Sequence, residues 1–193
     1  MPRNVEIKAK LTDVEFVVRK AKELSSSEGE IQRQHDVFFN VPNGRLKLRY
    51  MQGGDAMLIF YDREDTQGPK LSVFEKVVVP SGELTESLLK SALGVKGVVR
   101  KTRRLFLVGQ TRVHVDSVQD LGDYMELEVA TEFFRRFPRH CSTSNWRPVQ
   151  HQVMLEDSQS LEDGQAIARS LIGQLGVRED DLVCGAYLDL LNS

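Results

Sequence analysis

The sequence predicts an α+β fold made mainly of antiparallel strands, and three observations support this prediction. Short segments that alternate apolar and polar residues recur along the chain up to Ala130. Turn-forming residues such as Pro42-Asn43-Gly44 separate neighbouring segments at the distance that a hairpin needs. Helical periodicity is restricted to a few stretches, and it dominates only the last third of the chain.

Individual elements follow from these patterns in chain order. Residues 4–11 form the first predicted strand, because Val5 and Ile7 alternate with charged residues. Thr12 and Glu15 match a capping box, which predicts a helix that ends near residue 24. Further strands are predicted at 34–39, 45–51, 56–63, 70–79, 98–108, 112–117 and 124–129. Further helices are predicted at 83–93 with Gly94 as C-terminal cap, at 161–175, and near 181–191.

The composition is that of a single domain over residues 1–193. With 40% hydrophobic and 28% charged residues, the chain is long enough for one core. A net charge of −2 argues against nucleic-acid or anionic-membrane partners, because these attract strongly basic proteins. No apolar leader or membrane-spanning run is present, so we expect a cytoplasmic monomer or homodimer. Cys141 and Cys184 are the only two cysteines and lie far apart in the sequence, which argues against a zinc site or a disulfide framework.

Residues 130–152 fit neither a strand period nor a helix period. The stretch holds several arginines and phenylalanines and the lone Trp146, and loops of this length are uncommon in compact domains. We interpret it as an inserted loop, because its removal would join Glu128-Val129 to residues 153–157 in one strand. Its basic and aromatic residues leave a second interpretation open, in which the protein acts through contacts of this segment.

Six strand segments place charged or polar side chains two residues apart, and such residues share one face of a strand. The sets are Glu6/Lys8, Lys47/Arg49, Tyr61/Arg63, Lys101/Arg103, Arg112/His114/Asp116 and Glu126/Glu128. A solvated outer face is the ordinary explanation for any one of them. Like charges side by side cost stability, however, unless a ligand or a metal ion compensates them. The six sets together therefore predict a binding site.

These segments occur in an order that is shared with a known family. Asn4-Val5-Glu6-Ile7-Lys8 is similar to an amino-terminal Glu-x-Glu-x-Lys signature, although Asn4 replaces the first glutamate. The other matching segments are Leu46-Lys47-Leu48-Arg49, Lys101-x-Arg103, Arg112-Val113-His114-Val115-Asp116, Leu121-Gly122 before Glu126-x-Glu128, and Tyr187-Leu188-Asp189-Leu190-Leu191. Together they resemble the CYTH superfamily of triphosphate tunnel metalloenzymes, which includes class IV adenylyl cyclases, thiamine triphosphatases and inorganic tripolyphosphatases.

The resemblance implies a closed antiparallel β-barrel of about eight strands that forms a tunnel, with helices packed outside. It also implies a small-molecule triphosphate substrate and a divalent cation, Mg²⁺ or Mn²⁺, which prefers oxygen ligands. The implied metal ligands are Glu6, Asp116, Glu126 and Glu128, and the candidate catalytic residues are Glu6, Glu126 and Glu128. The candidate substrate-binding residues are Lys8, Lys47, Arg49, Tyr61, Arg63, Lys101, Arg103 and Arg112.

We therefore expect an enzyme that hydrolyses a tripolyphosphate or an organic triphosphate, such as thiamine triphosphate or a nucleoside triphosphate. The first alternative is a class IV-type adenylyl cyclase, which would convert ATP to cyclic AMP and pyrophosphate. The second is a barrel that binds polyphosphate or nucleotide without catalysis. His114 is interpreted as a hydrogen-bonded residue of the wall rather than a catalytic one. Lys70 and Ser72 are candidates to join the phosphate-binding set.

Overall fold

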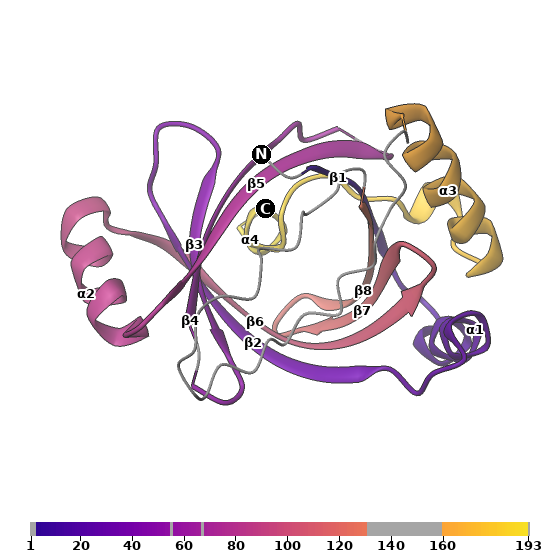
Figure 1. The fold of residues 1–193 in the computed structure, drawn as a ribbon, viewed down its shortest axis with the longest axis horizontal. Helices are drawn as coiled ribbons and strands as arrows, with labels where there is room; N and C mark the ends of the chain where they lie inside the picture. The colour runs from indigo at the N-terminus through magenta and orange to yellow at the C-terminus, as the bar shows by residue number, and fades with distance from the viewer. Residues whose placement is uncertain (1–2, 55, 67, 131–159, 193) are drawn as a thin grey trace, which may run out of the picture.

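The chain folds into a closed β-barrel with helices on its outside, shown in Figure 1 for a computed structural model. The structure describes residues 3–54, 56–66, 68–130 and 160–192. Eight strands of the described chain close the barrel in the order β1-β5-β4-β3-β2-β6-β7-β8, and neighbouring strands are antiparallel. The predicted α+β fold and the expected eight-stranded tunnel are thereby confirmed.

Most strands lie where the sequence predicts them. The strands are β1 (Arg3–Lys10), β2 (Glu30–Phe39), β3 (Arg45–Met51), β4 (Ala56–Arg63), β5 (Lys70–Val79), β6 (Val95–Val108), β7 (Thr111–Val118) and β8 (Gly122–Ala130). The helices are α1 (Val14–Ser25), α2 (Gly82–Leu93), α3 (Leu161–Gln174) and α4 (Tyr187–Leu191), with a 3-10 turn η1 (Glu179–Asp181). The bounds of β3, β4 and β5 agree with the prediction, whereas β2 and β6 begin a few residues earlier.

Helix α1 is present, but its N-terminal cap differs from the predicted one. Asp13 is the N-cap residue, and its Oδ1 accepts a hydrogen bond from the backbone amide of Phe16 at 2.9 Å. An aspartate at this position also places negative charge at the positive end of the helix dipole. The capping box predicted from Thr12 and Glu15 is therefore wrong.

Residues 182–186 are not helical, which corrects the single helix predicted near 181–191. Leu182 forms an antiparallel bridge with Ala9 of β1. Gly185 has a φ of +80°, a left-handed conformation that ends regular helix and that glycine adopts without steric cost. Helix α4 begins only after this glycine, at Tyr187.

Two further expectations concern the predicted inserted loop and the absence of a membrane-spanning segment. The predicted loop at 130–152 and the strand at 153–157 lie outside the described residues, except for Ala130, which ends β8. Within the described chain, none of the helices combines the length and the apolar character needed to cross a bilayer.

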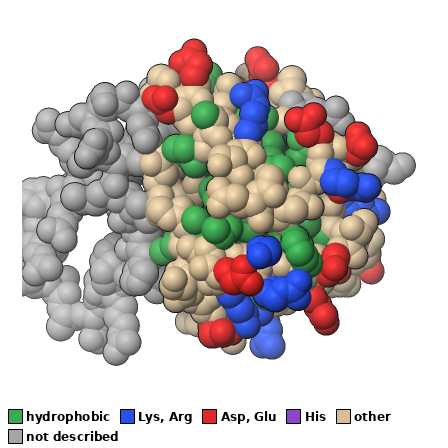
Figure 2. Space-filling model, turned by 90° about the vertical axis from the view of Figure 1, so that its right-hand side faces the viewer, with side chains coloured by type: hydrophobic (Ala, Val, Ile, Leu, Met, Phe, Trp, Pro, Cys, Tyr) green, Lys and Arg blue, Asp and Glu red, His purple; other side chains and the backbone are tan. Residues whose placement is uncertain are grey.

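The largest apolar core lies outside the barrel wall, beneath helices α1 and α3. On β8, Met125, Leu127 and Val129 are fully buried on this outer side, whereas Glu126 and Glu128 alternate with them and face the interior. The helices thus cover an apolar outer surface of the strands, and the barrel keeps a polar interior. On the helix-bearing face in Figure 2, acidic and basic side chains are interspersed among neutral ones.

The C-terminal segment packs across the barrel. Tyr187 and Leu188 of α4 are buried in a cluster with Phe38, Val99, Val118 and Tyr124. Gly97 of β6 permits this close packing, because a Cβ atom there would lie 2.4 Å from Cδ1 of Leu188. Figure 1 accordingly shows α4 within the outline of the ring of strands.

The outer core makes a direct prediction about stability. Replacing the fully buried Leu127 by alanine removes apolar contacts in the core beneath α1 and α3 and should lower the free energy of unfolding by about 2 to 5 kcal/mol. The matched control is Leu84→Ala on α2, because Leu84 is 74% exposed, and its effect should stay within about 0.5 kcal/mol. Urea unfolding of both variants is the measurement, and equal effects of the two changes would contradict this placement of the core.

Candidate active site

The barrel encloses a cavity of about 960 Å³ that is lined by all eight strands and by the C-terminal segment. Basic residues outnumber acidic residues on its described wall by eight to five. The basic residues are Lys8, Lys47, Arg49, Arg63, Lys76, Lys101, Arg103 and Arg112. The acidic residues are Glu6, Glu30, Asp36, Glu126 and Glu128. A cavity with this wall favours an anionic ligand that several cations surround.

Every residue predicted to bind substrate lies on this wall, as do Glu6, Glu126 and Glu128. Strand alternation explains this result, because each set of residues two apart faces the same side of its strand. Ser72 lines the cavity as well. Lys70 is buried near it, and its Nζ donates to the backbone oxygen of Thr66 at 2.8 Å.

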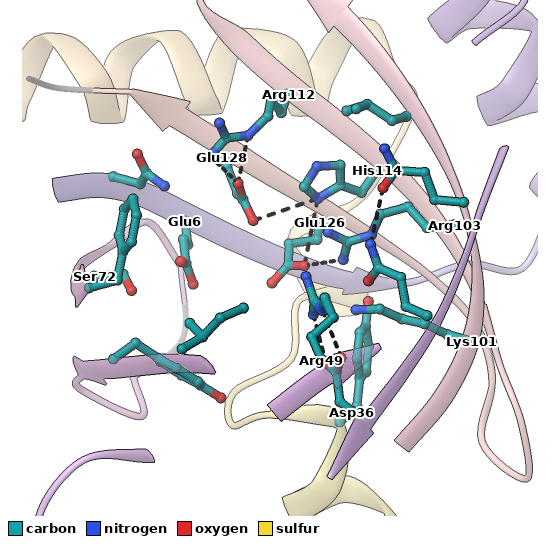
Figure 3. A pocket seen from close by; sticks show the side chains of 18 of the residues that line it. Glu6, Asp36, Arg49, Ser72, Lys101, Arg103, Arg112, His114, Glu126 and Glu128 are labelled. Carbon is teal, nitrogen blue, oxygen red and sulfur yellow. Dashed lines mark hydrogen bonds and ion pairs between the residues drawn. The ribbon is translucent and has the colours of Figure 1, made fainter. Parts of the chain in front are cut away.

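Glu126, Glu128 and His114 form one cluster on the wall built by β7 and β8 (Figure 3). In the β7–β8 register, His114 lies opposite Glu126, and Arg112 lies opposite Glu128. Each of the three offers a ligand atom, and these atoms lie within 4.8 Å of one another. The Nδ1 atom of His114 is 3.7 Å from Oε2 of Glu126 and 3.7 Å from Oε1 of Glu128. Two carboxylates and an imidazole at this spacing fit a divalent cation.

Burial and the nearby Arg103 guanidinium lower the pKa of His114. A histidine with a lowered pKa is neutral at neutral pH, and the neutral imidazole is the form that can ligate a metal. Burial acts to raise the pKa of Glu126, but Lys8, His114 and Arg103 hold it well below its usual range. Glu126 is therefore ionised, as a metal ligand has to be.

Glu6 has a different environment from the cluster on β7 and β8. Its carboxylate pairs with the guanidinium of Arg63, which also donates to the backbone oxygen of Gly185 at 2.9 Å. Burial raises the pKa of Glu6, although Arg63 acts in the opposite direction. A buried carboxylate with a raised pKa is suited to accept a proton near neutral pH.

Asp116 anchors a cation instead of joining the metal cluster. Arg103 donates to its two oxygens from Nε at 2.7 Å and from Nη2 at 2.6 Å, and the hydroxyl of Tyr187 donates to Oδ2 at 2.9 Å. Burial opposes ionisation of Asp116, but Arg103 and Lys101 keep its pKa well below the usual range. The same Arg103 Nη2 lies 2.7 Å from Oε2 of Glu126, so Arg103 links the anchor to the cluster.

Asp36 is a second anchor, and sequence reasoning missed it. Its two oxygens accept from Arg49 at 2.7 and 2.6 Å, and Oδ2 also accepts from Lys47 at 3.0 Å. Despite full burial, these two cations hold the pKa of Asp36 well below its usual range. The pattern of alternation on β2, with Gln34 and Phe38 on either side, places Asp36 on the inner face.

Two lysines of the wall carry strongly lowered pKa values. Burial and the neighbouring Arg49 lower the pKa of Lys47 to about 8. Burial and the neighbouring Arg103 lower the pKa of Lys101 to about 7. Both lysines therefore lose charge near neutral pH, and an anionic ligand would restore it by favouring the protonated form.

Lys8 and Tyr61 complete the expected substrate-binding set. The Nζ atom of Lys8 lies 3.5 Å from Oε1 of Glu126 and 4.1 Å from the ring centroid of Tyr187. The ring centroid of Tyr61 lies 5.4 Å from Nζ of Lys47 and 5.7 Å from Cζ of Arg63. Tyr61 thus supports two cations that point into the cavity.

The family of the chain follows from a comparison of its sequence with family models. The model of the CYTH domain matches residues 2–138, which is more than half of the chain. The chain belongs to the CYTH domain family. No curated protein matches the sequence.

Solved structures with the same fold cover nearly all of this CYTH protein. The PH1012 protein from Pyrococcus horikoshii OT3 is 23% identical, with a TM-score of 0.75 over 98% of this chain and 99% of its own. A proposed adenylate cyclase from Vibrio parahaemolyticus is 17% identical, with a TM-score of 0.70 over 98% of both chains. A proposed adenylyl cyclase from Hippeastrum, described as having a dominant triphosphatase activity, is 11% identical, with a TM-score of 0.60 over 100% of this chain and 95% of its own. At these identities the structures support the fold alone.

The lowered pKa of Lys47 predicts how anion binding depends on pH. Tripolyphosphate in this cavity would bind the charged form of Lys47, so its affinity should fall as pH rises through about 8. Arginine stays charged throughout this range, so the affinity of the Lys47→Arg variant should not show the decrease that deprotonation of Lys47 causes. The ratio of wild-type to variant affinity should drop roughly tenfold between about pH 7 and about pH 9, because one proton is coupled to binding.

Isothermal titration calorimetry in metal-free buffer measures this ratio. Ionisation of tripolyphosphate itself affects both proteins equally and cancels. A ratio that stays constant across the range would mean that Lys47 is fully charged before the anion binds.

Proposed function

We propose that this CYTH protein is a metal-dependent triphosphatase that hydrolyses a tripolyphosphate or an organic triphosphate inside its barrel. The observation that carries the proposal is the wall of the cavity, where basic side chains converge from several strands and carboxylates gather beside His114. A triphosphate needs this combination, because its oxygens point in all directions and its charge is high.

The cations would bind the phosphate chain. Arg49 and Arg103 present planar forks that can hold two phosphate oxygens each, and Asp36 and Asp116 fix their orientation. Lys47 adds a charge that adjusts its position more freely. These side chains would neutralise the charge that develops on the leaving phosphate as the bond to the terminal phosphorus breaks.

Glu126 and Glu128 would hold a divalent cation, for which Mg²⁺ and Mn²⁺ are the candidates, with Glu6 near enough in the barrel to complete its water shell. When bound, such a cation supplies charge stabilisation and a water of lowered pKa. Glu6, whose pKa is raised by burial, is the residue best suited to take a proton from the attacking water. Asn4 lies on the same wall and replaces one carboxylate of the signature by an amide.

Apolar residues in the same cavity support a substrate with an organic group. Met57, Ile59 and Phe74 line one part of the wall, and Leu105 and Leu107 line another. Inorganic tripolyphosphate would leave these side chains in contact with water alone, whereas a base or a thiamine ring would bury them.

A class IV-type adenylyl cyclase is the second candidate, since a proposed adenylate cyclase shares the fold. In this reaction the ribose 3′-oxygen attacks the α-phosphorus of ATP, and pyrophosphate leaves. The same cations would bind the phosphates in both reactions, so the products distinguish them.

The substrate is tested by incubating the protein and Mg²⁺ or Mn²⁺ with ATP, tripolyphosphate and thiamine triphosphate in separate reactions. The proposal expects inorganic phosphate and the corresponding diphosphate from at least one of them. Cyclic AMP as the sole product would favour the cyclase. Binding of all three without any product would favour a barrel that binds without catalysis.

The role of the carboxylates makes a further prediction. Glu126→Gln keeps the shape of the side chain but weakens metal binding, so hydrolysis should fall at least about 100-fold. In EDTA, tripolyphosphate at about 100 times its dissociation constant should still stabilise the variant by roughly 2.7 kcal/mol, as it does the wild type. The control Glu15→Gln changes an exposed glutamate of α1 and should leave both properties unaltered.

Activity assays with a thermal-shift series measure the two effects separately. Full activity of Glu126→Gln would show that the carboxylate cluster has no role in hydrolysis. Loss of the thermal shift in that variant would place Glu126 in phosphate binding or in folding instead.

A further inference from the structure

The side chain of His114 is buried in a way that a purely structural role does not explain. Its side chain is 3% exposed, and Nδ1 is buried without a hydrogen-bond partner in the described part of the chain. Buried polar atoms in proteins nearly always have a partner, so an exception calls for an explanation. The sequence-based interpretation of His114 as a hydrogen-bonded wall residue does not supply one, because its Nδ1 lacks that bond.

The neighbours of Nδ1 suggest the missing partner. Both carboxylate oxygens that face it lie 3.7 Å away, which exceeds the range of about 2.7 to 3.2 Å for a hydrogen bond. Ligand atoms that surround one divalent ion at about 2.0 to 2.3 Å lie about 3 to 4 Å from one another. The spacing around Nδ1 therefore matches ligands of a shared ion better than a hydrogen-bonded triad.

The surrounding arginines hold the carboxylates in this arrangement. Arg103 donates to Oε2 of Glu126 at 2.7 Å, and Nε of Arg112 donates to Oε2 of Glu128 at 2.8 Å. Oε1 of Glu128 is thereby turned toward His114, as Figure 3 shows for the three side chains. His114 itself comes from the adjacent strand, opposite Glu126, so strand pairing fixes its distance from both glutamates.

We propose that Nδ1 of His114 is a direct metal ligand together with Glu126 and Glu128, and that it makes the site prefer transition-metal ions such as Mn²⁺ and Co²⁺ over Mg²⁺. Imidazole nitrogen is a good ligand for transition metals, whereas Mg²⁺ binds almost entirely through oxygen. The inference deepens the proposed function, because it names the ion class that this site takes. It does not require that the bound ion supports hydrolysis.

Pulsed electron paramagnetic resonance of bound Mn²⁺, with no triphosphate present, tests the ligand directly. Nitrogen bonded to Mn²⁺ modulates the echo signal, and growth on ¹⁵N-histidine changes the modulation frequency. The wild-type protein should show this histidine coupling. His114→Leu should abolish it and weaken Mn²⁺ and Co²⁺ at least about tenfold, while the affinity for Mg²⁺ changes less than about threefold.

His35→Leu is the matched control. Among the described residues, a buried ring nitrogen of His35 also has no hydrogen-bond partner, but this ring lies beside that of Tyr50 and is not among the described residues that line the cavity. This variant should keep the histidine coupling and the wild-type affinities for all three ions. Loss of the coupling in His114→Leu, together with its retention in His35→Leu, assigns it to His114 among the four histidines of the chain. Absence of the coupling in the wild type overturns the assignment even if a variant folds poorly.

Bound Mn²⁺ without histidine coupling would overturn the assignment, as would an equal loss of Mn²⁺ and Mg²⁺ affinity in His114→Leu. Hydrolysis is assayed in parallel on the same samples. Histidine coupling in a protein that hydrolyses no triphosphate would support the ligand and overturn the proposed function. Hydrolysis of a triphosphate without histidine coupling would support the proposed function and overturn the assignment of His114 as a metal ligand.

Discussion

Ion pairing inside the barrel is the interaction on which the rest of the structure depends. Arg49 and Arg103 are each held by both oxygens of a buried aspartate, and the two pairs lie on neighbouring parts of the wall, one on β2 and β3 and the other on β6 and β7. Removing one partner of such a pair leaves an uncompensated buried charge and typically costs about 3 to 5 kcal/mol. The same pairs hold the guanidinium groups at the wall of the cavity, so the aspartates that compensate these charges also position them for an anionic ligand.

A charged interior determines where the apolar core lies. Because the inner face of the strands is polar, their outer face carries the apolar residues, and helices α1 and α3 cover it. The C-terminal segment then closes the barrel from within, where Tyr187 bonds to Asp116 and packs against Lys8 and Lys101. The last helix is therefore part of the charged network as well as part of the fold.

Features of the fold that depend on local sequence patterns are predicted well from the sequence. Features that depend on pairing between distant residues are predicted poorly. The turns around Gly44 and Gly53 set the bounds of β3 and β4, because these positive-φ glycines mark the hairpin turns. Strand alternation likewise predicts which side chains line the cavity. The ion pairs of Asp36 and the approach of His114 to Glu126 depend on which strands are neighbours and in which register, and this information is not local. The non-helical residues before Gly185 depend in the same way on the contact of Leu182 with β1.

If the proposed function is right, phosphate oxygens bind the wall cations whose orientation Asp36 and Asp116 fix. A crystal structure with a nonhydrolysable triphosphate and Mn²⁺ tests it most directly. We expect the triphosphate inside the barrel, with Arg49, Arg103 and Lys47 on its oxygens and the ion between Glu126 and Glu128. A triphosphate bound only on the outer surface, with none in the cavity, would contradict the proposed function.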